Sequence, residues 1–158
     1  MSDPGKFSRI TPFLWFDANA EAAVDFYMSV FPNSRKLNEL RMNADGGPMP
    51  KGSVLTIAFE LDGATFTAMN GGPGHSFTDA ISFVVRCESQ AEIDAYWSKL
   101  TADGGKEIQC GWLKDKFGLS WQVVPANIGE LLKGPKAMQA LMGMKKLVIA
   151  ELERASNS

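Results

Sequence analysis

Histidine and cysteine are scarce in this 158-residue sequence, which contains one histidine, His75, and two cysteines, Cys87 and Cys110. A disulfide framework or a zinc ribbon needs more cysteines at a regular spacing, so the sequence excludes both. A metal site made mainly of imidazole ligands would have to borrow residues from a second chain. The chain on its own therefore carries no cysteine- or histidine-based metal motif.

Long apolar runs and an excess of one charge are also missing. The first ten residues, MSDPGKFSRI, have no apolar core of signal-peptide length, and no later run approaches a membrane span. We therefore expect a cytoplasmic protein with no membrane partner. Sixteen Lys and Arg stand against eighteen Asp and Glu, giving a net charge of −2 without any basic block. Because the electrostatic footprint of a nucleic-acid-binding protein is absent, we expect no nucleic-acid partner.

The most informative stretch that is present covers residues 110–125, CGWLKDKFGLSWQVVP. It predicts two short strands, 110–113 and 119–124, joined by a tight turn, and Pro125 ends the second strand. In that second strand the side chains alternate, with Trp121 and Val123 on one face and Ser120 and Gln122 on the other. A strand face that is polar but uncharged lines either solvent or a cavity.

The order of the predicted elements indicates an internal repeat. An apolar content of 45% in 158 residues fits one globular unit, or two half-sized repeats that share a core. A strand, a helix and three strands are expected before the glycine-rich segment 71–75, and the same order begins again after it. The expected strands cover 10–17, 34–42, 53–61 and 64–70 in the first half and 79–86, 106–109, 110–113 and 119–124 in the second. Asn19 is expected to cap the first helix, and a capping box over 89–92 opens the second.

Corresponding positions in the two halves lie at fixed offsets. Phe13 and Phe83 are 70 residues apart, while Gly63 and Gly118, which each open a last strand, are 55 apart. We therefore predict a first βαβββ module over residues 8–70, a linker over 71–78, a second βαβββ module over 79–125 and a C-terminal helical extension over 126–158, all within one structural domain. In the extension, one amphipathic face is expected to carry Met138, Leu141, Met142, Val148 and Leu152.

Three stretches resemble a known group of proteins: ITPFLWFDANAEAAVDFY at 10–27, CGWLKDKFGLSWQVVP at 110–125 and MKKLVIAELERA at 144–155. They are similar to the PhnB-like group, whose members often carry the label 3-demethylubiquinone-9 3-methyltransferase. The paired modules resemble the vicinal oxygen chelate superfamily of glyoxalase I, bleomycin-resistance proteins and extradiol dioxygenases. The resemblance implies an α+β fold in which two βαβββ modules form a curled mixed sheet around a cavity, with C-terminal helices and frequent association of two chains. We accordingly expect a homodimer, but not one particular reaction, because one fold hosts many functions.

The resemblance also implies where a metal would be held. Enzymes of that superfamily place one ligand on the first strand of each module and a carboxylate on each last strand. In this chain these positions fall on Ile10, Ala80, Thr67 and Gln122, or on Thr11 and Ile81 if the first strands slip by one residue. Aliphatic, hydroxyl and amide side chains do not hold a divalent cation as carboxylates and imidazoles do. We therefore expect no metal and no other cofactor.

The methyltransferase label implies S-adenosylmethionine, which usually binds at a glycine-rich turn between a strand and a helix. Gly71–Gly74 follows a predicted strand, but Pro73 and the next strand leave no helix for this turn to open. We interpret the segment as a linker, so the label gives weak support for that activity.

The candidate ligand-binding residues form a neutral polar set: Thr65, Thr67, Ser82, Ser120 and Gln122, with Trp112 beside them. They could orient a small polar or aromatic ligand in a cavity, or they could be satisfied by neighbouring strands. Trp112 could stack on a flat ligand, or it could pack in the core or at a dimer contact. The remaining candidates have simpler interpretations: Cys110 as a buried inert thiol, His75 as a solvated loop residue, and Lys114, Asp115 and Lys116 as a charged turn.

Two main functional hypotheses follow, and the sequence leaves open whether the chain is an enzyme. The first is a metal-independent small-molecule-binding protein that uses the cavity of the fold. The second is a metal-dependent glyoxalase- or dioxygenase-type enzyme, whose metal is held by residues such as His75, Glu60 or Asp79. A third possibility is a pure interaction module. The catalytic residues are unknown under each of them.

Overall fold

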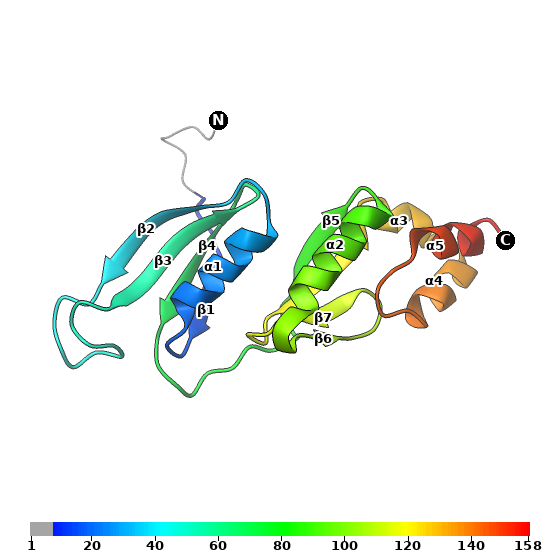
Figure 1. Cartoon of the computed structure of the whole chain (residues 1–158). Helices are drawn as coiled ribbons and strands as arrows, with labels where there is room; N and C mark the ends of the chain where they lie inside the picture. Colours follow the sequence, from blue (N-terminus) through cyan, green and yellow to red (C-terminus); the bar gives the residue numbers. More distant parts are fainter. Residues whose placement is uncertain (1–7) are drawn as a thin grey trace. The chain divides into compact units, whose positions relative to one another are not determined.

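A computed structural model describes residues 8–158 of the chain. The chain divides into two units, the first ending at Ser76 and the second running from Phe77 to Ser158. Each unit carries its own four-stranded mixed sheet with a long helix lying across one face (Figure 1).

The first unit contains a sheet of strand order β1-β4-β3-β2. Strand β1 pairs in parallel with β4, while the β3–β4 and β2–β3 pairs are antiparallel. The elements are β1 (Phe13–Phe16), α1 (Ala20–Val30), β2 (Arg35–Arg41), β3 (Val54–Leu61) and β4 (Ala64–Asn70). This order is the predicted βαβββ module, with β1 at one edge of the sheet, directly after Pro12.

Helix α1 covers one face of this sheet and leaves the other uncovered. In β3, Ile57 and Phe59 are fully buried on the helix side, while Thr56 and Ala58 on the other side are half-buried. Alternation places successive side chains of a strand on opposite faces, so the polarity pattern read from the sequence fixes which face packs. We call the face of each sheet that the long helix does not cover the open face.

The start of α1 differs from the expected cap. Asn19 precedes the helix as predicted, but its side chain makes no capping hydrogen bond. Instead Asn70, at the end of β4, accepts a hydrogen bond from the Ala20 N–H through Oδ1 (2.8 Å). The expected Asn19 cap is therefore wrong, because a residue 50 positions away fills the role and only the tertiary fold brings it there.

The second unit repeats the arrangement with strand order β5-β8-β7-β6. Strand β5 is parallel to β8, and the β7–β8 and β6–β7 pairs are antiparallel. Its elements are β5 (Phe83–Cys87), α2 (Gln90–Thr101), a 3₁₀ turn η1 (Ala102–Gly104), β6 (Lys106–Glu107), β7 (Trp112–Lys114) and β8 (Ser120–Pro125). The predicted cap is confirmed at Ser89, whose Oγ accepts from the Glu92 N–H (3.2 Å). The return bond of the box differs by one residue, because Glu92 Oε2 accepts from the Glu88 N–H (3.0 Å) rather than from the Ser89 N–H.

The strand pairing corrects one predicted correspondence between the two modules, that of Phe13 with Phe83. Phe13 pairs with Thr67 in the first sheet, and Val84 pairs with Gln122 in the second. Phe13 therefore corresponds to Val84 rather than to Phe83, an offset of 71. The shift arises because the connection from β1 to α1 has three residues, 17–19, whereas the connection from β5 to α2 has two, 88–89.

The C-terminal extension forms α3 (Ile128–Leu131), α4 (Pro135–Met142) and α5 (Ile149–Ser156). Its apolar core consists of Leu131, Met144, Leu147 and Leu152, packed with Val124 of β8. The predicted single apolar face is wrong, because the chain turns at Gly143 and leaves Met138 and Met142 44% and 62% exposed.

One side chain of α2 holds the extension in place. Gln90 donates to the Leu147 carbonyl through Nε2 (3.0 Å) and accepts from the Ile149 N–H through Oε1 (2.8 Å). Lys146 adds an ion pair to Asp94 (2.9 Å). Gln90 Nε2 also donates to Asp94 Oδ1 (3.0 Å), and this hydrogen bond, followed by the one from Lys146, lowers the pKa of the Asp94 carboxyl. The extension is thus a packed part of the second unit.

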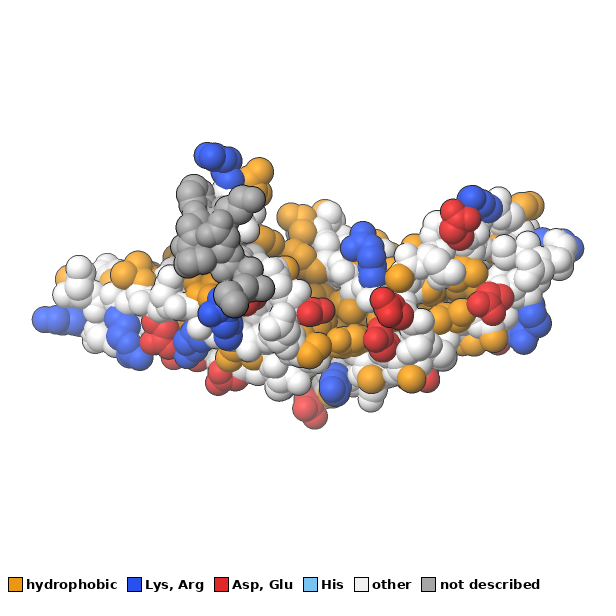
Figure 2. Space-filling model, turned by 90° about the horizontal axis from the view of Figure 1, so that it is seen from above, with side chains coloured by type: hydrophobic (Ala, Val, Ile, Leu, Met, Phe, Trp, Pro, Cys, Tyr) orange, Lys and Arg blue, Asp and Glu red, His pale blue; other side chains and the backbone are white. Residues whose placement is uncertain are grey.

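The predicted α+β class is confirmed, with two mixed four-stranded sheets that are not closed into a barrel. Across residues 8–158 no helix has the length and apolarity needed to cross a membrane. On the face that Figure 2 presents, Lys and Arg side chains are interspersed with Asp and Glu.

Candidate ligand-binding surface

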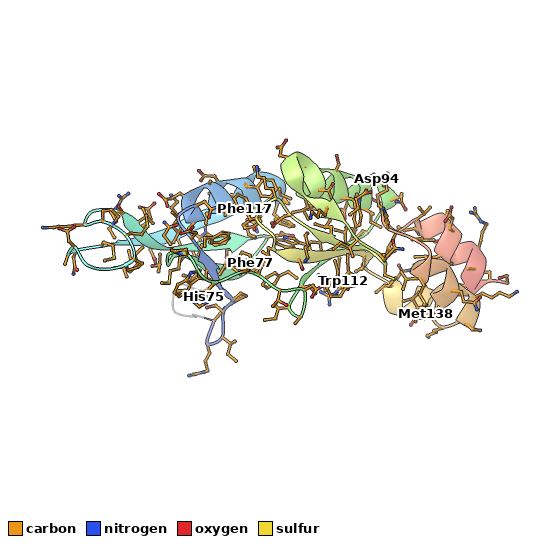
Figure 3. All side chains as sticks on the ribbon, turned by 90° about the horizontal axis from the view of Figure 1, so that it is seen from below. His75, Phe77, Asp94, Trp112, Phe117 and Met138 are labelled. Carbon is orange, nitrogen blue, oxygen red and sulfur yellow. The ribbon has the colours of Figure 1, made fainter. Side chains whose placement is uncertain are left out.

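The open face of the second sheet brings four of the predicted site residues together. Trp112 of β7 lies directly opposite Gln122 of β8, and Lys114 lies opposite Ser120. Because residues directly opposite one another in a sheet share a face, these side chains form one surface. Figure 3 places Trp112 on the side of the sheet away from α2.

Gln122 and Ser82 are joined across this face. Gln122 Nε2 donates a hydrogen bond to Ser82 Oγ, at 2.9 Å and 40 residues apart in the chain. Since Ser82 Oγ accepts this bond, its own hydrogen can still be donated elsewhere. Gln122 Oε1 accepts no hydrogen bond from residues 8–158. The pair therefore offers a ligand both a donor and an acceptor.

Ser120 is the unusual member of the set. It is 1% exposed, and its Oγ is the only buried side-chain nitrogen or oxygen in the described part of the chain without a hydrogen-bond partner. Leaving a buried hydroxyl unpaired costs free energy, and such groups in native proteins call for an explanation. A ligand atom that pairs with this hydroxyl would remove the cost.

One end of this surface is closed by the C-terminal extension. Val124 lies on the same strand as Gln122 and two residues further on, so it shares the open face. It packs into the apolar cluster with Leu131 and Leu147. The part of the face left for a ligand is therefore the part around Ser120, Gln122 and Trp112.

The remaining two predicted residues, Thr65 and Thr67, lie on the open face of the first sheet. Thr65 is opposite Glu60 of β3, and Thr67 is opposite Ala58 of β3 and Phe13 of β1. Both threonines are half-buried, and Phe13 is 57% exposed. This face is thus a mixture of hydroxyl and apolar groups, as its residue types predicted.

The glycine-rich segment after β4 is folded back on Trp15. The Trp15 indole Nε1 donates to the Gly72 carbonyl (2.9 Å), and its ring lies 4.4 Å from the exposed ring of His75. A side chain at Gly71 would overlap the Trp15 ring, so this position requires glycine. The interpretation of His75 as merely a solvated loop residue is incomplete, since it packs on Trp15 on the side of the sheet away from α1 (Figure 3).

Asp115 is the feature that sequence reasoning missed. It is 3% exposed and accepts hydrogen bonds from the Phe117 and Leu119 N–H groups through Oδ1 (2.8 and 3.1 Å), and from Trp121 Nε1 through Oδ2 (2.9 Å). The expectation of a simple charged turn is wrong for this residue. An aspartate whose side chain accepts from the backbone N–H two residues further on is a known turn signal. The bond to Trp121 could not be predicted from the spacing of the residues. Asp115 fixes the hairpin that carries Ser120 and Gln122.

The two thiols have opposite environments. Cys87 is buried, and burial, followed by the nearby negative charge of Glu92, raises the pKa of its thiol to about 11. Cys110 is half-buried, in a left-handed conformation (φ 61°), and its N–H donates to the Met144 carbonyl (2.8 Å). The expectation that Cys110 is a buried thiol is therefore wrong, and Cys87 is the inert one.

The residues at the superfamily's ligand positions do not fit a divalent metal ion. Ile10 and Ala80 lie ahead of β1 and β5, and the residues directly opposite Thr67 and Gln122 are Phe13 and Val84. Two residues earlier in the chain, ahead of each strand, stand Thr11 and Ser82. These side chains supply neutral oxygens or none at all, whereas a divalent cation needs carboxylate, imidazole or thiolate ligands.

The other residues considered for a metal are also dispersed. Glu60 forms an ion pair with Arg35 (3.0 Å), His75 packs on Trp15, and Asp79 is exposed in the second unit. Within residues 8–158 no group of three or more His, Cys, Asp or Glu side chains is close enough to hold a metal ion.

S-adenosylmethionine does not fit the glycine-rich segment either. The Gly71 and Gly72 N–H groups already donate to the Phe16 and Asp17 carbonyls (2.8 and 3.0 Å), which extends the β1–β4 pairing. The segment is followed by β5 rather than by a helix, so no helix N-terminus faces a ligand there.

Comparison with known proteins assigns the family. A family described as 3-demethylubiquinone-9 3-methyltransferase matches residues 8–124. The chain belongs to this family. The match spans both βαβββ modules and ends within β8, so the tail stretch MKKLVIAELERA lies outside it. No curated protein is significantly similar to the chain.

Solved structures agree with the family and the fold. A protein from Bacillus cereus described as a 3-demethylubiquinone-9 3-methyltransferase, PhnB protein, is 35% identical, with a TM-score of 0.66 over 74% of this chain and 99% of its own. The protein PA1353 from Pseudomonas aeruginosa is 20% identical, with a TM-score of 0.61 over 75% of this chain and 98% of its own, which supports the fold alone. A glyoxalase/bleomycin resistance protein from Albidiferax ferrireducens, at 14% identity and a TM-score of 0.47 over 73% of this chain and 97% of its own, is too distant to carry an argument. The PhnB-like resemblance is confirmed.

Proposed function

We propose that this protein binds a small organic molecule on the open faces of its sheets, without a metal ion and without methyl transfer. The observation that carries the proposal is the polar group on the second sheet: a joined Gln122–Ser82 pair beside a buried hydroxyl, Ser120, that lacks a partner. Neutral donors and acceptors of this kind orient a polar ligand by hydrogen bonds, whereas they make poor metal ligands.

The chemistry of the set favours a ligand with both polar and flat apolar parts. Gln122 Oε1 can accept a hydrogen bond, and the Ser82 and Ser120 hydroxyls can each donate one. Trp112 is half-buried directly opposite Gln122, so one part of its ring surface remains available for contact. A planar or aliphatic group lying on this ring would place its polar substituent beside the hydroxyls.

We also propose that the protein acts as a homodimer in the cytoplasm. Exposed apolar side chains support association: Phe13 and Val84 on the two open faces, and Ile10 and Ile81 just ahead of them. Where exposed apolar side chains form a contiguous patch, the patch commonly marks a contact with another chain. Light scattering coupled to size-exclusion chromatography would test the dimer, and a monomer at all concentrations would contradict it.

A ligand screen by thermal shift tests the binding proposal. The protein would be heated with a panel of small aromatic and aliphatic compounds, once in EDTA and once with a divalent ion, alongside Gln122→Ala and Ser82→Ala. Gln139→Ala and Ser98→Ala are matched controls, because both residues are exposed on helices away from this face. We expect hits that persist in EDTA and weaken in the two site variants only. Hits that require a divalent ion, or that are indifferent to Gln122 and Ser82, would contradict the proposal.

A further inference from the structure

Two lysines lie side by side on the open face of the second sheet. Lys106 of β6 is directly opposite Lys114 of β7, and Lys114 is directly opposite Ser120 of β8. Side chains in such pairs start roughly 5 Å apart, so the two ammonium groups and the buried hydroxyl share one row across three strands. We call Ser120, Lys114 and Lys106 the lysine row.

The first unit shows what the repeat carries at the same place. Its corresponding row is Thr65, Glu60 and Arg35, paired in the same order across β4, β3 and β2. There Arg35 Nε and Glu60 Oε2 form an ion pair at 3.0 Å. The second unit therefore has a lysine where the first has a glutamate, and the row lacks its internal counter-charge.

Among the described residues, no acidic side chain compensates for the missing glutamate. The acids adjacent in sequence, Glu107 and Asp115, bind the indole N–H groups of Trp97 (2.6 Å) and Trp121 (2.9 Å). Trp97 belongs to α2, so Glu107 points to the covered face. Neither Lys106 nor Lys114 has a carboxylate within 4 Å in the part of the chain that the structure describes.

Like charges directly opposite one another destabilise a sheet, and an unpaired buried hydroxyl adds a further cost. A single anionic ligand would relieve both. We propose that the lysine row binds the anionic oxygens of a small organic ligand, such as a carboxylate, phosphonate or phosphate group, while Trp112 contacts its apolar part. This inference rests on the proposed function and names the ligand class for the same surface.

Access to Ser120 requires a small rearrangement. Its Oγ is shielded from solvent, so an anionic oxygen reaches it only when neighbouring side chains shift. Lys114 lies directly opposite Ser120, and the four-carbon stem of a lysine adjusts readily. The ammonium group would then move from water to the anion, and charge-assisted hydrogen bonds would hold the ligand.

The test uses phenylphosphonate, inorganic phosphate and uncharged benzamide as calorimetric probes of the full-length protein. Lys114→Glu recreates the acid–base row of the first unit, so the fold should be kept and the anion site lost. Lys136→Glu is the charge-matched control, because Lys136 is exposed on α4 and forms no ion pair with residues 8–158. We expect phenylphosphonate affinity to fall on the order of tenfold or more in Lys114→Glu, since a charge-assisted contact is replaced by repulsion, and to change less than about twofold in Lys136→Glu.

The probes separate the possible outcomes. Tighter binding of phenylphosphonate than of phosphate supports an organic anion as the ligand, and equal binding supports a free inorganic anion. No binding of either anion, or unchanged binding by Lys114→Glu, overturns the anion site. If benzamide still binds and Gln122→Ala weakens it, the proposed function stands without the anion inference, and if benzamide also fails to bind, both are contradicted. The melting temperature of Lys114→Glu, expected to equal or exceed that of the wild type, shows that any loss of binding is not a loss of fold.

Discussion

Asn70 at the end of β4 caps helix α1 by accepting a hydrogen bond from the Ala20 N–H at 2.8 Å. The same side chain donates through Nδ2 to the Glu21 carboxylate (2.7 Å) and to the Val54 carbonyl (3.0 Å). Asn70 is fully buried, so these bonds are made away from water. One amide therefore ties the helix to two strands of the first sheet.

Replacing Asn70 by Ala should destabilise the first unit strongly. The change leaves the Ala20 N–H and the Val54 carbonyl without partners, which we expect to cost roughly 2–4 kcal/mol of unfolding free energy. Urea unfolding measures this loss of unfolding free energy. Asn38→Ala is the control, since Asn38 lies on the exposed edge strand β2 and should change stability by less than about 0.5 kcal/mol. Equal losses in the two variants would contradict the capping role.

Removing the charge and one acceptor at Asp115 should destabilise the hairpin formed by β7 and β8. In Asp115→Asn the amide cannot accept from both the turn N–H groups and the Trp121 indole, so we expect a loss of roughly 1–3 kcal/mol. A double-mutant cycle with Trp121→Phe should give a coupling above about 0.5 kcal/mol. Asp103→Asn is the control, because this exposed residue has a φ of 56° that asparagine adopts equally well. Additive effects at 115 and 121 would show that the hydrogen bond is unimportant.

A methyl group at Gly71 should displace the Trp15 ring. The added carbon would overlap the indole, so Gly71→Ala should cost roughly 1–3 kcal/mol, as overpacking does, and should shift the fluorescence of Trp15. Gly129→Ala is a matched substitution with open space around it, and we expect it to be neutral or slightly stabilising. If Gly71→Ala leaves both stability and fluorescence unchanged, the packing of this segment on Trp15 is not required.

The two cysteines should react with thiol reagents at different rates. Cys110 is half-buried and should be labelled in the native protein, whereas Cys87 should react only after unfolding.

Burial raises the pKa of Cys87 from the ordinary 9.0 to about 11, so the unfolded chain releases this proton first as the pH rises. The stability contributed by the neutral thiol is therefore complete below about pH 9 and is lost progressively between about pH 9 and 11. If the unfolding free energy falls less steeply with pH in Cys87→Ala than in the wild type, this pH dependence belongs to Cys87. Identical pH profiles of the two proteins would contradict that assignment.

The local pattern of the sequence predicted most of the fold. Alternation in β8 predicted its two faces, because burial on one side of a sheet imposes a period of two. The Ser89 cap was equally readable, since its partner is a few residues away. The first strands were placed several residues too early at Ile10 and Asp79, because nothing local distinguishes a strand from the extended chain leading to it.

The features that could not be predicted depend on the folded chain. The cap by Asn70 joins residues 50 positions apart. The Asp115–Trp121 bond crosses a hairpin whose exact geometry spacing does not give, and the turn at Gly143 separates Met138 from the cluster around Leu152. The candidate site was predicted in part for the same reason. Alternation gave Ser120 and Gln122 a common face, but the pairing of Lys106 with Lys114 needs the register of two further strands.

Native mass spectrometry tests the central claim most directly. The protein would be purified without chelator and without a metal-affinity step, and its subunit count and bound mass would be read together. The account predicts a dimer that carries no metal ion, with any adduct being a small organic molecule. One divalent ion per chain, lost on addition of EDTA together with thermal stability, would contradict it and would favour the metal-dependent enzyme instead.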